Sequence, residues 1–306
     1  MKNPQTEHPL DTLTQARIDR RKFFRQAGMF GLGAAATGLA LGSAPSAWAD
    51  SAGEEQEESA QSKDTVKEIF TAALIAEDLA TTFYYNALVG PVIQDPNLAG
   101  PGGSATNVTA SGNFGNVDYV RAALSEEISH ASLFRSLLGI PSAAKDPVQT
   151  FYFPNGTFDQ LASFTGLLDA LENAFIGAYL NAIQEFALKA AQVRGSGQND
   201  NDGTAYGPNP YTAQQLEYYA KVAASIMGIE CEHRVLGRVI SNTNPANNLC
   251  YEQTDGLNAV YNGPKSAVAA LTPFLTSSTG KGYSLAEALA HQASVSVPCT
   301  GAPPAY

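Results

Sequence analysis

Two copies of the pattern Glu-x-x-His stand out among the residues that can do chemistry. They are Glu127-Ile128-Ser129-His130 and Glu230-Cys231-Glu232-His233. On a helix, a step of three residues turns by about 300° and rises about 4.5 Å, so the acid and the imidazole project from the same face. This spacing suits two ligands of one metal centre.

Two isolated acids complete the pattern, because Glu77 and Glu172 each interrupt an otherwise apolar helical stripe. The order along the chain is Glu, Glu-x-x-His, Glu, Glu-x-x-His. The interval from Glu77 to Glu127 is 50 residues, and that from Glu172 to Glu230 is 58. This near-repeat predicts two similar helical hairpins related by a pseudo-twofold axis, as in di-metal carboxylate bundles.

Charge gives a physical reason for metal at such a site. Four carboxylates in a bundle core repel one another, and removing each from water costs several kcal/mol. Two divalent cations neutralise them, while neutral imidazoles complete the coordination; carboxylate oxygen with imidazole nitrogen suits Fe, Mn or Zn. We expect Glu127 and Glu230 to bridge, with one histidine on each metal. The predicted ligands are Glu77, Glu127, His130, Glu172, Glu230 and His233.

An alternative interpretation is that these acids are solvated and the helices are phased wrongly. Glu126 and Glu232, each adjacent to a predicted ligand, are natural solvent-face residues and show how a slip of one residue can arise. Tyr84 and Tyr179 lie seven residues beyond the isolated acids, on the same helix faces. They are candidates either for core packing or for hydrogen bonds to the site.

The elements that must position these residues are four long segments with helical periodicity. They run from about Asp64 to Val89, Val117 to Leu138, Phe158 to Val193 and Thr212 to Ile240. We expect Asp64 and Thr157 to cap the first and third helices. The Gly/Pro/Asn-rich connections are long for a bundle. Thr150 to Phe153 reads as a short strand, and Lys265 to Leu275 and Ser284 to His291 read as short helices.

This constellation resembles the ferritin-like superfamily, close to bacterial ferritin-like-domain proteins related to plant desiccation-related proteins. The resemblance covers about residues 64–241. It implies an all-α, ferritin-like four-helix bundle with long connections, followed by a loop-rich C-terminal extension at 242–306, and two metal ions, iron or manganese, at the six ligands. The paired Cys-x-x-Cys of rubrerythrin-like relatives is absent, so no built-in electron donor is expected. Long loops and the tail argue against a storage cage, although a homo-oligomer stays open.

The first 49 residues resemble a twin-arginine export signal. Arg20-Arg21-Lys22-Phe23 precedes an apolar run, and Ala47-Trp48-Ala49 offers small residues for cleavage. The stretch departs from the usual pattern in Asp19 and Phe24; an ordinary secretory signal or an uncleaved anchor is the alternative. We expect a periplasmic or secreted protein that engages the twin-arginine export machinery, with an acidic linker at 50–63.

The charge of the remaining chain excludes several partners. Residues 1–49 hold six of the 18 basic and three of the 29 acidic residues, which leaves 12 basic against 26 acidic side chains and a formal charge of −14. Such a surface repels nucleic acid and anionic lipid, and no later stretch is apolar enough for stable membrane insertion. The sequence leaves open whether Cys250 and Cys299 form a disulfide in an oxidising compartment.

The resemblance implies a di-metal oxidoreductase whose partner is a small oxidant, O2 or peroxide, or ferrous iron. Ferroxidase, peroxidase and catalase-like activities are not separated by the sequence. No catalytic residue beyond the metal ligands is expected, because the chain has no phosphate-binding loop, nucleophile elbow or Ser/His/Asp pattern. The alternative is a non-catalytic, desiccation-protective structural protein that retains the fold.

Overall fold

A computed structural model describes the predicted bundle and part of the C-terminal extension. The described residues are 64–99, 115–196, 211–243, 246–247, 249–254, 256–257 and 270–299. The predicted export signal at 1–49 and linker at 50–63 lie outside them, and so do residues 265–269 of the short helix predicted from Lys265 to Leu275.

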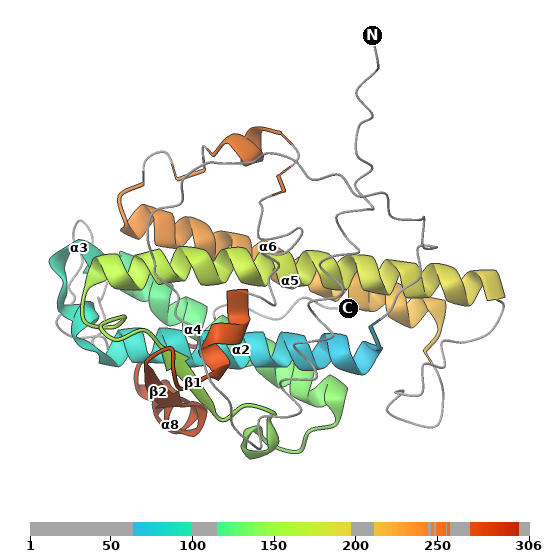
Figure 1. Cartoon of the computed structure of the whole chain (residues 1–306), viewed down its shortest axis with the longest axis horizontal. Coiled ribbons are helices and arrows are strands. Elements are labelled where there is room, and N and C mark those ends of the chain that lie inside the picture. The colour runs from blue at the N-terminus through green and yellow to red at the C-terminus, as the bar shows by residue number, and fades with distance from the viewer. Residues whose placement is uncertain are drawn as a thin grey trace, which may run out of the picture.

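Four long helices form the body of the protein. They are α2 (Val66–Val89), α4 (Asn116–Leu138), α5 (Leu161–Ser196) and α6 (Ala213–Ile240). The closest packing is of α2 against α4 and of α5 against α6, so the bundle consists of two hairpins. In Figure 1, α2, α5 and α6 run along the long axis of the molecule. The predicted all-α, ferritin-like four-helix bundle is confirmed.

Side-chain caps fix where two of these helices begin. The cap of α2 is Thr65, which exchanges hydrogen bonds with Glu68 in a capping box, and not Asp64 as predicted. The cap of α6 is Thr212, which forms the same box with Gln215. Each box satisfies backbone N–H groups that the first helical turn otherwise leaves without acceptors.

The predicted start of the third helix is wrong. Instead of capping a helix from Phe158, the Thr157 hydroxyl donates to the carbonyl of Pro154 at 2.7 Å. Residues 155–159 form a turn, with Gly156 at φ 82°. Because this left-handed backbone favours glycine and does not continue a helix, α5 begins only at Leu161.

Shorter elements decorate the bundle. They are η1 (Pro91–Gln94), α3 (Pro96–Ala99), η2 (Ala143–Lys145), β1 (Thr150–Phe153), η3 (Cys250–Gln253), η5 (Thr272–Leu275), β2 (Lys281–Ser284), α8 (Leu285–His291) and η6 (Gln292–Ser294). The predicted strand β1 pairs antiparallel with β2, so the C-terminal extension joins the connection between the two hairpins. The predicted helix near His291 is present as α8, which packs against α2.

The apolar core is divided into two clusters along the bundle. One contains Phe83 stacked on Phe164, with ring centroids 5.1 Å apart. The other contains Phe70 against Phe186, at 5.5 Å. Along α4 the buried members of the first cluster end at Leu124 and those of the second begin at Ala131, and the buried acids of the four long helices form a polar layer near this junction. The predicted metal ligands of α4 lie in this layer.

None of the described helices is both long and apolar enough to cross a membrane. All three cysteines are free thiols in the structure. Cys250 and Cys299 are exposed and Cys231 is half-buried, so the disulfide left open by the sequence is not formed.

Candidate metal centre

The structure brings all six predicted ligands together in the polar layer. They form two groups in which the candidate ligand atoms lie within 4.8 Å of one another. The first group is Glu77, Glu127, His130 and Glu230; the second is Glu127, Glu172, Glu230 and His233. Glu127 and Glu230 belong to both.

Each acid points into the bundle from a different helix. The exposed fractions are 2% for Glu77, 0% for Glu127 and Glu172, and 1% for Glu230. The alternative in which these acids face solvent is therefore wrong. Charged carboxylates are almost never buried to this extent unless they are paired or coordinate a metal.

The two shared acids lie between the two imidazoles. Glu127 turns Oε2 toward Nδ1 of His130, at 3.8 Å, and Oε1 toward Nδ1 of His233, at 3.0 Å. Glu230 divides its oxygens in the same way, at 3.9 Å from His130 and 3.5 Å from His233. One oxygen of each carboxylate for each histidine is the arrangement that bridging ligands require.

The two unshared acids are each held by a tyrosine from the opposite hairpin. Tyr84 of α2 donates to Oε1 of Glu172 on α5 at 2.5 Å. Tyr179 of α5 donates to Oε1 of Glu77 on α2, while Oε2 of Glu77 lies 3.2 Å from Nδ1 of His130. Both tyrosines are buried in the core and bonded to the site, so the two roles considered from sequence coexist.

Sequence reasoning missed one contact, because it assigned Glu126 to solvent. The Glu126 side chain is 44% exposed, yet its Oε2 lies 2.8 Å from Nε2 of His233. This contact crosses from α4 to α6. Its only signal in the sequence is the position of Glu126 next to Glu127, which does not reveal which partner a long side chain reaches.

Burial and mutual repulsion shape the protonation of the cluster. Burial raises the pKa of Glu127, and the charge of Glu77 raises it further. Burial likewise raises the pKa of Glu230, reinforced by the charge of Glu127. For His130, burial lowers the pKa, but the charges of Glu77 and Glu127 outweigh it and raise the pKa to about 11. Without cations, the cluster retains protons that metal ions would displace.

Several of the candidate ligand atoms lack a hydrogen-bond partner despite being buried. They are both oxygens of Glu127, Oε2 of Glu172, Oε2 of Glu230 and Nδ1 of His233. The 3.0 Å approach of His233 to Glu127 is close but does not have hydrogen-bond geometry. An unsatisfied buried polar atom costs about 1–3 kcal/mol. Five such atoms in one cluster are therefore unfavourable unless a further group satisfies them. Two divalent metal ions fit this set of carboxylate oxygens and imidazole nitrogens.

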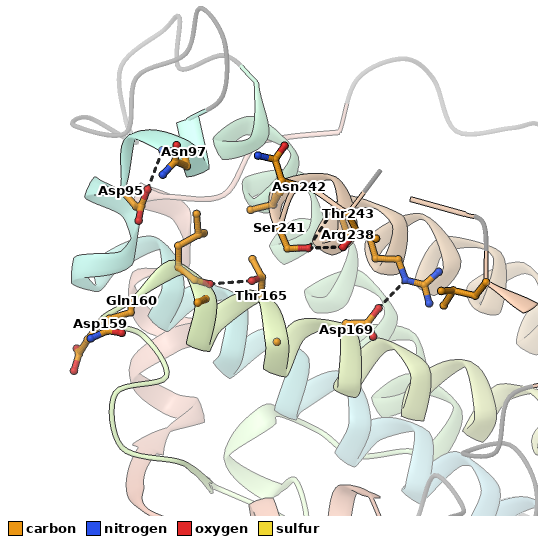
Figure 2. A pocket seen from close by; sticks show the side chains of 15 residues that line it. Asp95, Asn97, Asp159, Gln160, Thr165, Asp169, Arg238, Ser241, Asn242 and Thr243 are labelled. Atoms are coloured by element: carbon orange, nitrogen blue, oxygen red, sulfur yellow. Dashed lines mark hydrogen bonds and ion pairs between the residues drawn. The ribbon is translucent and has the colours of Figure 1, made fainter. Parts of the chain in front are cut away.

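A separate cleft of about 940 Å³ lies at one end of the bundle, between the start of α5 and the end of α6 (Figure 2). None of the six candidate ligands lines it. Arg238 in its wall bonds to Asp169 of α5 at 2.9 Å and to Glu252 of η3 at 2.6 Å. This part of the cleft wall therefore anchors the C-terminal extension to the α5–α6 hairpin.

Comparison with known proteins agrees with the fold. Residues 65–194 match the family described as the ferritin-like domain. The match covers α2, α4 and nearly all of α5, and it supports placing the protein in the ferritin-like superfamily. No curated protein and no solved structure matches the chain. The helix α6, with Glu230 and His233, lies beyond the matched range, so its part in the site rests on the geometry described above.

Proposed function

We propose that this is an exported ferritin-like protein that binds two iron or manganese ions between its four helices. Its activity is the reduction of O2 or peroxide, or the oxidation of ferrous iron, in defence against oxidative stress. The observation that carries this proposal is the buried cluster of four carboxylates and two imidazoles with unsatisfied ligand atoms. Bound iron or manganese supplies one-electron redox chemistry, and a pair supplies the two electrons that peroxide reduction needs.

The protein's own residues contribute charge balance and fixed geometry. Four carboxylates carry −4 when ionised, which two divalent cations neutralise. Tyr84 and Tyr179 each bind one oxygen of an unshared acid and leave the other oxygen facing the site. Because these side chains project from rigid helices, little reorganisation is needed when metal enters, which favours tight binding.

Elemental analysis of the mature protein, purified from its own host, tests the metal site directly. We expect about two irons or manganeses per chain. Glu127→Ala and Glu230→Ala each remove a shared ligand and should abolish binding of the pair. Glu232→Ala is the matched control, because it removes one exposed carboxylate near the site and should retain both ions. Full metal content in Glu127→Ala would refute the ligand assignment.

Turnover separates catalysis from a protective structural role. We expect the metal-loaded protein to consume peroxide, or to oxidise ferrous iron under O2, faster than the metal-free protein at equal concentration. Equal rates for the two forms, with metal fully bound, would instead favour the non-catalytic, desiccation-protective role. Glu127→Ala serves as the background control, since it keeps the remaining chain but loses the pair.

Export is supported by the resemblance of residues 1–49 to a twin-arginine signal. Mass spectrometry of the mature protein should find an N-terminus near Asp50. Replacing Arg20 and Arg21 together with lysine should retain the precursor in the cytoplasm, because the export receptor reads the arginine pair. Normal export of that variant, with the same cleavage, would point to the ordinary secretory route.

A further inference from the structure

The two halves of the metal centre differ in one residue. The pseudo-twofold relation pairs Glu127 and His130 of α4 with Glu230 and His233 of α6. The residue before the shared acid is Glu126 in α4 but Ile229 in α6. Glu126 reaches Nε2 of His233 at 2.8 Å. Within the described parts of the chain, His130 makes polar contacts through Nδ1 alone, so its Nε2 has no equivalent partner.

This difference acts on the two imidazoles in a predictable way. A carboxylate at Nε2 holds the proton on that nitrogen, which leaves the lone pair of Nδ1 directed at the metal position, and it increases the basicity of the imidazole. The contact from Glu126 therefore holds His233 in the orientation that binds metal, whereas His130 is held only through Nδ1, the nitrogen that would bind the metal, by Glu77 at 3.2 Å. His233 is also the more buried of the two, with side-chain exposures of 5% and 15%.

The remaining contacts do not cancel this difference. The shared acids Glu127 and Glu230 belong to both subsites. Each unshared acid accepts one tyrosine hydroxyl, so that support is the same on both sides. His130 also contacts Glu77 through Nδ1, at 3.2 Å, but both groups are candidate ligands of the same subsite. Among the residues that the structure describes, the contact from Glu126 is thus the one asymmetric hydrogen bond that reaches a candidate histidine ligand from outside the ligand set.

We propose that the two subsites fill in order. The subsite containing His233 and Glu172 binds its ion first and more tightly, and the subsite containing His130 and Glu77 binds second and exchanges its ion. Glu126 is the positioning residue that sets this order. The inference rests on the proposed metal binding, and it adds that one of the two ions is labile.

Titration of the metal-free full chain with Mn²⁺ by equilibrium dialysis tests the order. We expect two binding steps whose dissociation constants differ at least tenfold. Crystals of the protein at one equivalent of Mn²⁺ should show anomalous scattering beside His233 and little beside His130. A chelator should remove one ion quickly and the other slowly.

Variants of the asymmetric residues separate positioning from general stability. Glu126→Ala should weaken the first step by about 10–100-fold, the usual effect of removing the group behind a ligating histidine, and leave the second step nearly unchanged. Glu126→Gln retains an acceptor and should recover part of that loss. Ile229→Glu gives His130 an equivalent partner and should strengthen the second step. Glu232→Ala removes the same charge from an exposed position and should alter neither step.

The outcomes are distinguishable. The ordered filling would be overturned if both metal positions were equally occupied at one equivalent of Mn²⁺. It would also be overturned if Glu126→Ala and Glu126→Gln each weakened the first and second binding steps equally. Either result would preserve the proposed metal site. Absence of Mn²⁺ and Fe²⁺ binding in the folded wild-type chain would overturn the proposed function itself, and the order with it. Thermal unfolding of each variant, measured in parallel, identifies any that fail to fold.

Discussion

The tyrosines of the centre look equivalent, yet their removal should have unequal costs. Tyr84→Phe keeps the ring and deletes the hydroxyl that bonds Oε1 of Glu172. Because Oε2 of Glu172 has no partner in the described structure, the variant leaves this fully buried carboxyl with no hydrogen bond. A buried polar group left without a hydrogen bond costs about 1–3 kcal/mol, so we expect a loss of that size in the metal-free protein.

Tyr179→Phe should cost less. Glu77 loses its tyrosine but keeps the imidazole of His130, whose Nδ1 lies 3.2 Å from its other oxygen. We expect Tyr179→Phe to lose about 1 kcal/mol of stability. If the loss in Tyr84→Phe lies at the middle of its expected range, it is about 1 kcal/mol larger. For a domain of this size, each kcal/mol lowers Tm by about 2–4 °C.

Urea and thermal unfolding of the two metal-free variants measure this difference. Tyr219→Phe is the matched control: its ring packs against Phe70 and Phe186, and no hydrogen bond of its hydroxyl contributes to the site. We expect it to remain within about 0.5 kcal/mol of wild type. Equal losses in Tyr84→Phe and Tyr179→Phe, or a larger loss in the latter, would refute the reasoning from orphaned oxygens.

Three further measurements follow from buried charge. The pKa of His130 is raised from 6.5 to about 11, so between these pH values the folded metal-free protein binds more protons than the unfolded chain. Its free energy of unfolding should therefore fall as the pH rises, by about 1.4 kcal/mol per pH unit for each extra proton. Urea unfolding at several pH values measures this fall. Arg135 bonds the buried Asp78 at 2.5 Å and Asp146 at 2.6 Å, so Arg135→Met should destabilise by about 3–5 kcal/mol, against at most about 1 kcal/mol for Arg194→Met, which breaks only an exposed pair. Metal at a thousandfold excess over Kd should stabilise the folded protein by about 4 kcal/mol and raise Tm; an unchanged Tm would contradict binding to the native state.

Much of the bundle follows from periodicity, because the apolar stripe of each long helix is distinct. The site is predictable for a related reason. An acidic residue in an apolar helical stripe is unfavourable unless its charge is compensated. Helix starts were less predictable. Thr65 and Asp64 are both good caps, and only the reciprocal bond with Glu68 selects Thr65. The start of α5 depended on a turn at Gly156 that helical spacing does not encode.

The contact of Glu126 was not predictable for a different physical reason. Periodicity assigns a helix position to a face, and this residue does lie at the solvent edge of α4, with its side chain 44% exposed. Its carboxylate nevertheless meets His233, because α4 and α6 approach each other there and a glutamate is long enough to cross the gap. Such contacts depend on the relative placement of two helices far apart in sequence, which a pattern along one helix does not contain.

The candidate metal site extends beyond the residues that match the ferritin-like domain. Residues 65–194 contain Glu77, Glu127, His130 and Glu172, which include three of the four members of the first group and two of the four members of the second. In both groups Glu230 comes from α6, and the second group also takes its only imidazole, His233, from that helix. A chain ending at the matched boundary would keep three carboxylates and one imidazole, too few ligands for two ions. Binding of two metal ions therefore depends on α6, and metal content must be measured on a chain that includes this helix.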